Sequence, residues 1–234
     1  MSASDRRRRR PARDGPWRTD RDERRRRLGQ NFLLPDVAES FVALGAFAPG
    51  ELVIEVGAGR GACTAALARR GVEVLALEHD PHWADALRHR ARREHWRSVR
   101  VVEGDALALP LHRLARGRPF RVLGSLPFGI TTALLRHLFD DVAHAPWRAD
   151  LIVQWEVARK RAAVPPTTLV STTWAPWWTF DVVRRIPATS FRPVPRVDAG
   201  VLRVTRRTPA LLPERLAGGY AEFVRRSWTG SPPP

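Results

Sequence analysis

The chain has 234 residues, enough for one domain with a modest extension, and 44% of them are hydrophobic, enough for a core. Its 40 lysines and arginines against 24 aspartates and glutamates give a formal net charge of +16, which favours a polyanionic partner such as nucleic acid. No run approaches the ~18 apolar residues of a membrane span, and Cys63, the single cysteine, excludes an internal disulfide or a cysteine-based zinc site.

These observations predict a cytoplasmic protein without a membrane partner, and we expect no secretory signal. The seven histidines are scattered and show no ligand spacing, so no metal is expected either. Residues 1–27 hold twelve arginines against five acids and lack apolar periodicity, which predicts a disordered, arginine-rich arm. Two interpretations of this arm stay open. It is either an extension that grips RNA, ending in Arg24, Arg25, Arg26 and Arg27, or a solvated tail rich in arginine because of codon composition.

From residue 28 onward, strands are predicted to alternate with helices. Helical spacing of apolar residues predicts helices over 35–47, 63–70, 81–94 and 131–139. Short apolar runs predict strands over 52–56, 72–77, 99–102, 120–123 and 151–154. This alternation is typical of a parallel sheet covered by helices.

Beyond residue 165 the alternation weakens. Residues 201–205 alternate like a half-buried strand, and 208–228 can form one or two short helices before a Pro-rich tail that we expect to be disordered. Trp174, Trp177 and Trp178 could stack on RNA bases, but packing in the core or on the sheet is favoured.

In an open α/β sheet, ligands bind beyond the carboxyl ends of the strands. The first strand is followed by Gly57-Ala-Gly59-Arg-Gly61, and glycines here allow a tight turn and a close approach of backbone to ligand. The third glycine comes one residue earlier than in the dinucleotide fingerprint G-x-G-x-x-G. The shorter form is better known from methyltransferases that bind S-adenosylmethionine. A nicotinamide oxidoreductase would also need a catalytic constellation that is not found.

Acidic residues follow the next two strands. Glu78 stands 21 residues after Gly57 and can accept hydrogen bonds from both hydroxyls of a ribose. Asp105, after the third strand, can accept a hydrogen bond from the exocyclic amine of an adenine, or it can cap a turn.

The fourth strand ends in Ser125-Leu-Pro-Phe128, which is the most informative segment. A small polar residue, a spacer, proline and an aromatic residue resemble the [DNS]-P-P-[YFW] signature of amino-methyltransferases. The exocyclic amine of adenine is a poor nucleophile, because its lone pair is delocalised into the ring. A side-chain oxygen and a backbone carbonyl can hold that amine for attack, while an aromatic ring stacks on the extruded base.

The ordered motifs together resemble the Erm rRNA adenine N6-methyltransferases and, more distantly, the KsgA-type dimethyladenosine transferases. The segment from Leu28 to Leu33 resembles the family's Q-N-F-L signature, and Leu151–Arg161 resembles the segment after its fifth strand. Phe191–Ala199 resembles F-x-P-x-P-x-V-D-S. The resemblance implies a Rossmann-like methyltransferase with a mostly parallel seven-stranded sheet. It places the catalytic domain at 28–207 and a short, truncated helical remnant with a disordered tail at 208–234.

The resemblance also implies residue roles. Asn31 and Leu33 would close over S-adenosylmethionine, while Gly57 and Gly59 would line its amino-acid end. The full set implied for the cofactor is Asn31, Leu33, Gly57, Gly59, Glu78, Asp105 and Ser125. The set implied for catalysis is Ser125, Leu126, Pro127 and Phe128, in which Ser125 and the Leu126 carbonyl orient the amine and Phe128 stacks the base.

The implied activity is methylation of an adenine in 23S rRNA by a monomeric enzyme, with resistance to macrolide, lincosamide and streptogramin B drugs. Arg159, Lys160 and Arg161 are candidates for phosphate contact, although a solvated helix face explains them equally well. The family usually has asparagine where Ser125 stands, and serine has a shorter reach. A KsgA-like 16S rRNA dimethylase and a non-catalytic RNA-binding relative are the alternatives.

Overall fold

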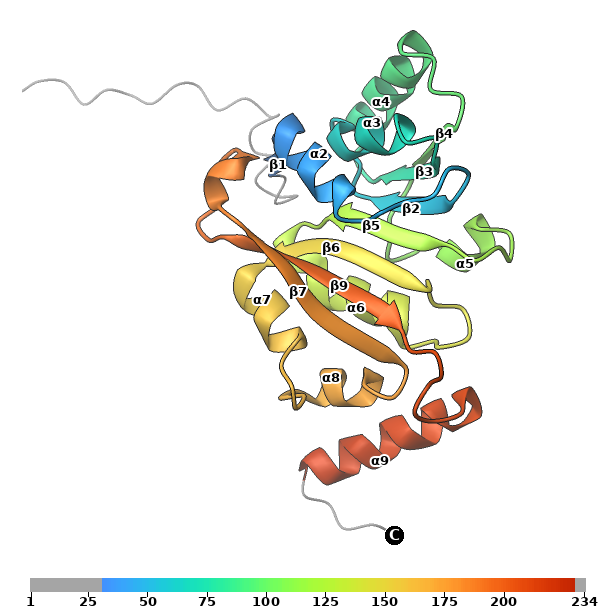
Figure 1. Ribbon diagram of the computed structural model, residues 1–234, viewed down its shortest axis with the longest axis vertical. Helices are drawn as coiled ribbons and strands as arrows, with labels where there is room; N and C mark the ends of the chain where they lie inside the picture. The colour runs from blue at the N-terminus through green and yellow to red at the C-terminus, as the bar shows by residue number, and fades with distance from the viewer. Residues whose placement is uncertain (1–30, 230–234) are drawn as a thin grey trace, which may run out of the picture. The chain divides into compact units, whose positions relative to one another are not determined.

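The computed structural model describes residues 31–229, and these are built around one large sheet (Figure 1). Its seven strands run in the order β4-β3-β2-β5-β6-β9-β7. The five strands from β2 to β6 are parallel to one another, whereas β9 is antiparallel to both β6 and β7. The sheet strands are β2 (Leu52–Val56), β3 (Glu73–Glu78), β4 (Val99–Glu103), β5 (Arg121–Ser125), β6 (Arg148–Gln154), β7 (Trp178–Ile186) and β9 (Ala199–Arg206). The predicted fold class, a mostly parallel seven-stranded Rossmann-like sheet, is therefore confirmed.

Helices cover both faces of the sheet. Successive residues of a strand point to opposite faces, and accordingly Leu52 and Ile54 pack into one core while Val53 packs into the other. The helices are α2 (Pro35–Ala43), α3 (Ala62–Ala68), α4 (Pro81–Arg93), α5 (Leu111–Leu114), α6 (Thr131–Phe139), α7 (Trp155–Arg161), α8 (Leu169–Trp174) and α9 (Ala217–Thr229). Short 3-10 turns occur at η1 (Phe128–Ile130), η2 (Ala188–Ser190) and η3 (Glu214–Leu216). Within the described residues, no helix is long and apolar enough to cross a membrane.

The start of α4 is set by local sequence. Asp80 accepts a hydrogen bond from the His82 amide (3.0 Å), and Pro81 occupies the first helical position, where a missing N–H costs nothing. The first helix predicted from apolar spacing, 35–47, is shorter in the structure, because α2 ends at Ala43. The backbone then turns away, and Ala46 adopts a positive φ of 47°.

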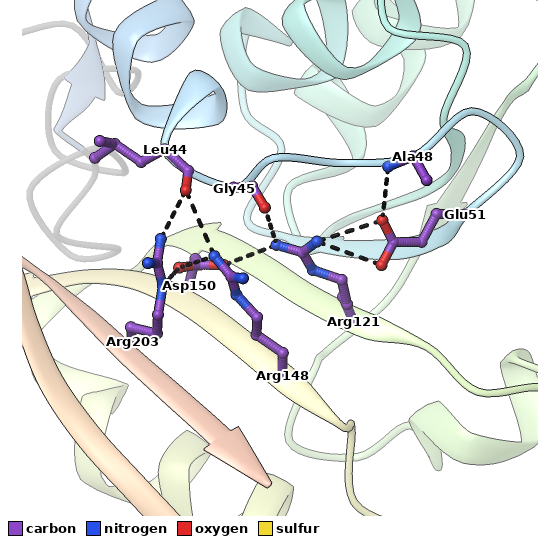
Figure 2. Close-up of polar contacts among 8 residues, drawn as sticks. All are labelled: Leu44, Gly45, Ala48, Glu51, Arg121, Arg148, Asp150 and Arg203. Atoms are coloured by element: carbon purple, nitrogen blue, oxygen red, sulfur yellow. Dashed lines mark hydrogen bonds and ion pairs between the residues drawn. The ribbon is translucent and has the colours of Figure 1, made fainter.

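The early end of α2 is explained by a buried ion cluster under its carboxyl end (Figure 2). The Asp150 carboxylate accepts hydrogen bonds from Arg121 (3.1 Å), Arg148 (2.9 Å) and Arg203 (2.7 Å). Arg203 also donates to the Leu44 carbonyl (2.7 Å), and Arg121 donates to the Gly45 carbonyl (2.8 Å). The Leu44 and Gly45 carbonyls would accept backbone amides if the helix continued. They accept hydrogen bonds from arginines of the sheet instead.

Arg121 is the most enclosed member of this cluster, with 2% of its side chain exposed. Burial lowers the pKa of its guanidinium, with the positive charge of Arg148 as a second cause, but arginine keeps its charge in proteins. Glu51 supplies a second carboxylate at 3.3 Å, and the Phe47 ring lies 3.9 Å from the guanidinium carbon. The cluster joins β5, β6 and β9 to the loop that leads into β2.

A second, two-stranded sheet joins distant parts of the chain. β1 (Phe32–Leu33) pairs antiparallel with β8 (Phe191–Arg192), and the Leu34 amide donates to the Ser190 carbonyl (3.0 Å). The segment that resembles Q-N-F-L is therefore hydrogen-bonded to the segment that resembles F-x-P-x-P. Strand prediction missed both pieces because each is only two residues long.

The three tryptophans lie in the core, as predicted. Trp174, Trp177 and Trp178 are 1%, 2% and 0% exposed. The Trp177 indole packs edge-on against Tyr220 of α9 at 5.8 Å, and Tyr220 donates to the Thr172 carbonyl (3.4 Å). The helix expected within 208–228 is thus present and is packed on α8 (Figure 1). The arginine-rich segment 1–27 lies outside the described residues.

We expect Asp150→Asn to lower the free energy of unfolding by about 3–5 kcal/mol, because three arginines would lose their shared buried counter-charge. Urea unfolding followed by circular dichroism measures this loss. Asp85→Asn is the matched control, since its side chain is 67% exposed and its pair with Arg88 is worth little. A loss below about 1 kcal/mol for Asp150→Asn would contradict the role assigned to the cluster.

Candidate active site

The glycine-rich turn after β2 lies at the carboxyl ends of the parallel strands. Gly57, Gly59 and Gly61 have φ values of 73°, 52° and 75°, which side-chain-bearing residues rarely adopt. The amides of Gly57 and Ala58 both donate to the Leu77 carbonyl, at 2.9 and 3.1 Å. The turn is therefore folded back onto the end of β3, and its glycines are required by backbone conformation.

Glu78 ties this turn to the second strand end. The Gly59 amide donates to its Oε2 (2.7 Å) and the Asp80 amide donates to its Oε1 (2.8 Å), so both carboxylate oxygens are fixed in direction. Glu78 is 5% exposed, and burial raises the pKa of its carboxyl despite these two hydrogen bonds. Each oxygen keeps a lone pair for a further donor, such as a ligand hydroxyl.

Helix α4 holds the same turn from outside. Arg90 donates from one guanidinium nitrogen to the carbonyls of Arg60 (3.0 Å) and Gly61 (3.2 Å), and its Nε binds Glu94 (2.8 Å). A Cβ on Gly61 would lie 2.4 Å from the Leu87 side chain, so α4 packs directly on the turn. No sequence pattern distinguishes Arg90, because a surface arginine on a basic helix looks like many others.

The Ser125–Phe128 turn lies beside the glycine turn. A Cβ on Gly57 would lie 3.5 Å from the Ser125 carbonyl oxygen. Ser125 pairs with Ile152 in the parallel β5–β6 ladder, and the Leu126 amide donates to the Ile152 carbonyl (3.0 Å). Ser125, Pro127 and Phe128 are each half-buried, whereas Leu126 is 4% exposed. The structure thus brings the first and fourth strand-end motifs together.

The remaining predicted ligand positions are arranged around these two turns. Asp105 is exposed and its Oδ1 accepts the Leu107 amide (2.9 Å), which is the turn-capping arrangement, so its role toward an adenine stays a prediction. Leu33 is buried in β1, and Asn31 precedes it. The structure also draws attention to Phe32, because a Cβ on Gly59 would lie 3.0 Å from its ring.

An aromatic and arginine cluster flanks the glycine turn. The Phe32 and Trp83 rings meet edge-on at 5.0 Å. The Arg60 guanidinium lies 4.7 Å from the Phe32 centroid and 5.1 Å from that of Trp83. Sequence reasoning missed these three residues as a group, since they come from segments far apart in the chain.

A buried acid underlies the turn. Glu55 is 2% exposed and accepts a hydrogen bond from the Thr64 hydroxyl (2.6 Å). Burial raises the pKa of Glu55 to about 8, and the negative charge of Glu78 contributes in the same direction. Burial also raises the pKa of the nearby Cys63 thiol, which is 6% exposed and acts as a small core residue, as predicted.

The basic residues of α7 divide into two kinds. Arg159 and Lys160 are exposed, and Arg159 pairs with Glu156 at 3.5 Å. Arg161 is half-buried, donates to the Thr168 hydroxyl (2.9 Å) and faces the Trp174 ring at 6.0 Å. Arg161 therefore has a packing role in the structure, while Arg24, Arg25, Arg26 and Arg27 lie outside the described residues.

Comparison with known proteins agrees with the family that the sequence motifs resemble. A profile of the family described as "Ribosomal RNA adenine dimethylase" matches residues 21–231. The chain is 41% identical over 208 residues, 88% of its length, to the mycinamicin-resistance protein MyrB of Micromonospora griseorubida. It is 39% identical over 209 residues, also 88% of its length, to an rRNA adenine N-6-methyltransferase of Streptomyces fradiae. The chain spans 63% of the length of each of these two relatives.

Solved structures give the same picture. The crystal structure of the 23S rRNA methyltransferase ErmE is similar with a TM-score of 0.72 and 28% identity, over 86% of this chain and 80% of that one. A dimethyladenosine transferase from Plasmodium falciparum matches with a TM-score of 0.73 at 18% identity, over 86% of this chain and 71% of that one. The second likeness concerns the fold alone.

Glu55 makes the stability of the free protein depend on pH. Because its folded pKa lies above its ordinary value of 4.5, the folded state holds the proton more tightly, and stability falls as pH rises from about 4.5 to about 8. We expect Glu55→Gln to remove about 3–5 kcal/mol of this pH-dependent decrease in the free energy of unfolding. Urea unfolding at pH 5 and pH 8 measures it, with exposed Glu156→Gln as control. Parallel pH profiles for wild type and Glu55→Gln would refute the assignment.

Proposed function

The chain belongs to the ribosomal RNA adenine dimethylase family, and we propose that it transfers methyl groups from S-adenosylmethionine to the N6 amine of an adenine in 23S rRNA. The observation that carries this proposal is the contact between the two turns. The glycine turn, locked to Glu78, lies against the Ser125 carbonyl. A cofactor held at the first turn and an amine held at the second would therefore be neighbours.

The residues present fit the cofactor. Gly57 and Gly59 carry no Cβ that would keep a ligand from their backbone, and Glu78 offers two oriented oxygens to the ribose hydroxyls. Asp105 has a second carboxylate oxygen for the adenine amine, and Asn31 and Leu33 are the sequence neighbours of Phe32, whose ring lies against Gly59. Bound S-adenosylmethionine supplies a sulfonium methyl that the adenine amine attacks directly. Arg90 keeps the turn in place through two backbone carbonyls.

The chain's contribution to the reaction is positioning. Ser125 Oγ and the Leu126 carbonyl accept the two N–H groups of the adenine amine, which aligns its nitrogen with the methyl group. Phe128, half-buried after Pro127, stacks on the extruded base. The amine loses one proton per methyl transferred, and no strong general base or metal is required. Unpaired nucleotides in folded RNA reach such a site most cheaply.

The RNA is held by arginines through its phosphates. Arg159 and Lys160 are exposed on α7, directly after the carboxyl end of β6. Arg192 is exposed in β8, which pairs with β1, and Arg196 is exposed in the segment that follows. Arg24, Arg25, Arg26 and Arg27 extend this set in the arm. We propose a cytoplasmic monomer whose product confers resistance to macrolide, lincosamide and streptogramin B drugs. The name of MyrB supports this for mycinamicin.

A 16S rRNA dimethylase is the second candidate. The chain is 33% identical over 208 residues to a ribosomal RNA small subunit methyltransferase A of Chlorobaculum parvum. The identities of 41% and 39% to MyrB and the Streptomyces fradiae enzyme are higher. The likeness to ErmE, which is named as a 23S rRNA methyltransferase, supports the large-subunit substrate.

The substrate is tested by methyl transfer from labelled S-adenosylmethionine to protein-free 23S and 16S rRNA, followed by mapping of the modified base. We expect label on one 23S adenine as N6-methyladenine or its dimethyl form. Label on 16S rRNA alone would move the protein to the second candidate. Intact cofactor binding without label on either RNA would indicate a non-catalytic RNA-binding protein.

The role of Ser125 is tested by two substitutions. Ser125→Ala removes an acceptor for the target amine, and losing one hydrogen bond of about 1–3 kcal/mol lowers kcat about 10- to 100-fold. Ser125→Asn supplies the longer acceptor usual in the family and should raise the ratio of dimethyl- to monomethyladenine. Wild-type kcat in Ser125→Ala, with cofactor affinity also unchanged, would remove Ser125 from the mechanism.

A further inference from the structure

A basic hollow lies at the end of the sheet opposite to the site described above. It has a volume of about 300 Å³ and is rimmed by Arg97, Arg100, Arg116 and Arg118. Its floor is formed by the amino ends of β2, β3 and β4, with Leu52, Val74 and Val99 among the lining residues. The rim comes from three places in the chain: the turn before β4, β4 itself and the loop after α5.

The hollow has a clear excess of positive charge. Four arginines line the hollow together with a single acid, Glu73, which pairs with Arg118 at 2.8 Å. Arg97, Arg100 and Arg116 are exposed and form no ion pair with a carboxylate of the described residues. This contrasts with the Asp150 cluster, where every arginine is matched to buried acids or carbonyls. The charge of the hollow is therefore available to a ligand.

The loop that carries two of these arginines has an unusual backbone. Arg116 has a φ of 54° and is followed by Gly117 with a φ of 71°, so two left-handed residues stand in succession. Arginine is disfavoured in this conformation, where glycine and asparagine are better tolerated.

The position of the hollow separates it from the catalytic turns. Glu73 begins β3 and Glu78 ends it, and six strand residues span roughly 20 Å. An RNA that enters both sites must therefore extend roughly 20 Å from the target adenine, further than a stem of about four base pairs reaches. Arginine guanidinium groups match phosphate oxygens in a bidentate manner.

We infer that this basic hollow binds the phosphate backbone of a second segment of the substrate RNA, away from the target adenine. The inference rests on the proposed function for the identity of the RNA. The hollow adds affinity and orientation to a long substrate and contributes nothing to the transfer itself. An alternative is that Arg100 only protects the open edge of β4 against pairing with another chain, and the experiment distinguishes the two.

The test compares R97Q/R100Q/R116N with the control R92Q/R93Q/R215Q, which removes three exposed arginines elsewhere. Asparagine is chosen at position 116 because it tolerates the positive φ. Binding is titrated against salt with two RNAs that contain the target adenine. One is a hairpin with a stem of about four base pairs, too short to reach the hollow, and the other is a domain-length 23S fragment.

On the long RNA we expect the hollow variant to raise Kd at least about 10-fold and to reduce the salt slope by about 2–3, since each phosphate contact contributes about 0.7–0.9. On the hairpin, the Kd and the salt slope of the hollow variant should equal those of wild type. Its kcat at saturating RNA should be unchanged. Equal slopes for the hollow variant and wild type, or equal losses in the hollow and control variants, would overturn the inference. If wild type binds with the predicted slopes but methylates neither rRNA, the proposed function fails while the hollow stands.

Discussion

The buried carboxylate of Asp150 is the interaction on which the arrangement of the catalytic strands depends. It accepts hydrogen bonds from arginines on β5, β6 and β9, and all three of those arginines also donate to the Leu44 or Gly45 carbonyl at the end of α2. Three cations around one acid would repel one another in a low dielectric, so the geometry must be kept for the charges to be compensated. The cluster therefore fixes the register of β5 against β6 at their amino ends.

That register determines what happens at the other end of the same strands. Leu123 pairs with Asp150, and two residues further on Ser125 pairs with Ile152. A slip of one residue between β5 and β6 would turn Ser125 to the opposite face of the sheet. The ion cluster and the target-amine turn lie at opposite ends of a five-residue strand, and a rigid strand transmits position directly. The buried ion cluster at the amino end of β5 thus helps to set the position of Ser125 at the carboxyl end.

Much of this arrangement could be predicted from sequence, for a physical reason. The parallel strands are buried on both faces and show as apolar runs, and helices between them show apolar spacing. The strand-end motifs were identifiable because glycine, acid and Ser-x-Pro-Phe each meet a specific backbone or chemical need. The start of β6 could not be predicted in this way, because Arg148 and Asp150 look like surface residues until their partners are known. Arg90 and the pairing of β1 with β8 depend on contacts between distant segments, which periodicity does not encode.

The many arginines of this chain differ in what satisfies their charge. Arg121 is enclosed and matched by Glu51 and Asp150, and Arg90 is used by the carbonyls of the glycine turn. Arg97, Arg100 and Arg116 have no acid partner among the described residues. Composition alone treats these groups as equal contributions to a net charge of +16. The unmatched ones attract a polyanion most strongly, because a guanidinium already paired with a carboxylate presents a weaker field to a phosphate. The useful measure of a basic protein's affinity for RNA is therefore the location of its uncompensated charge.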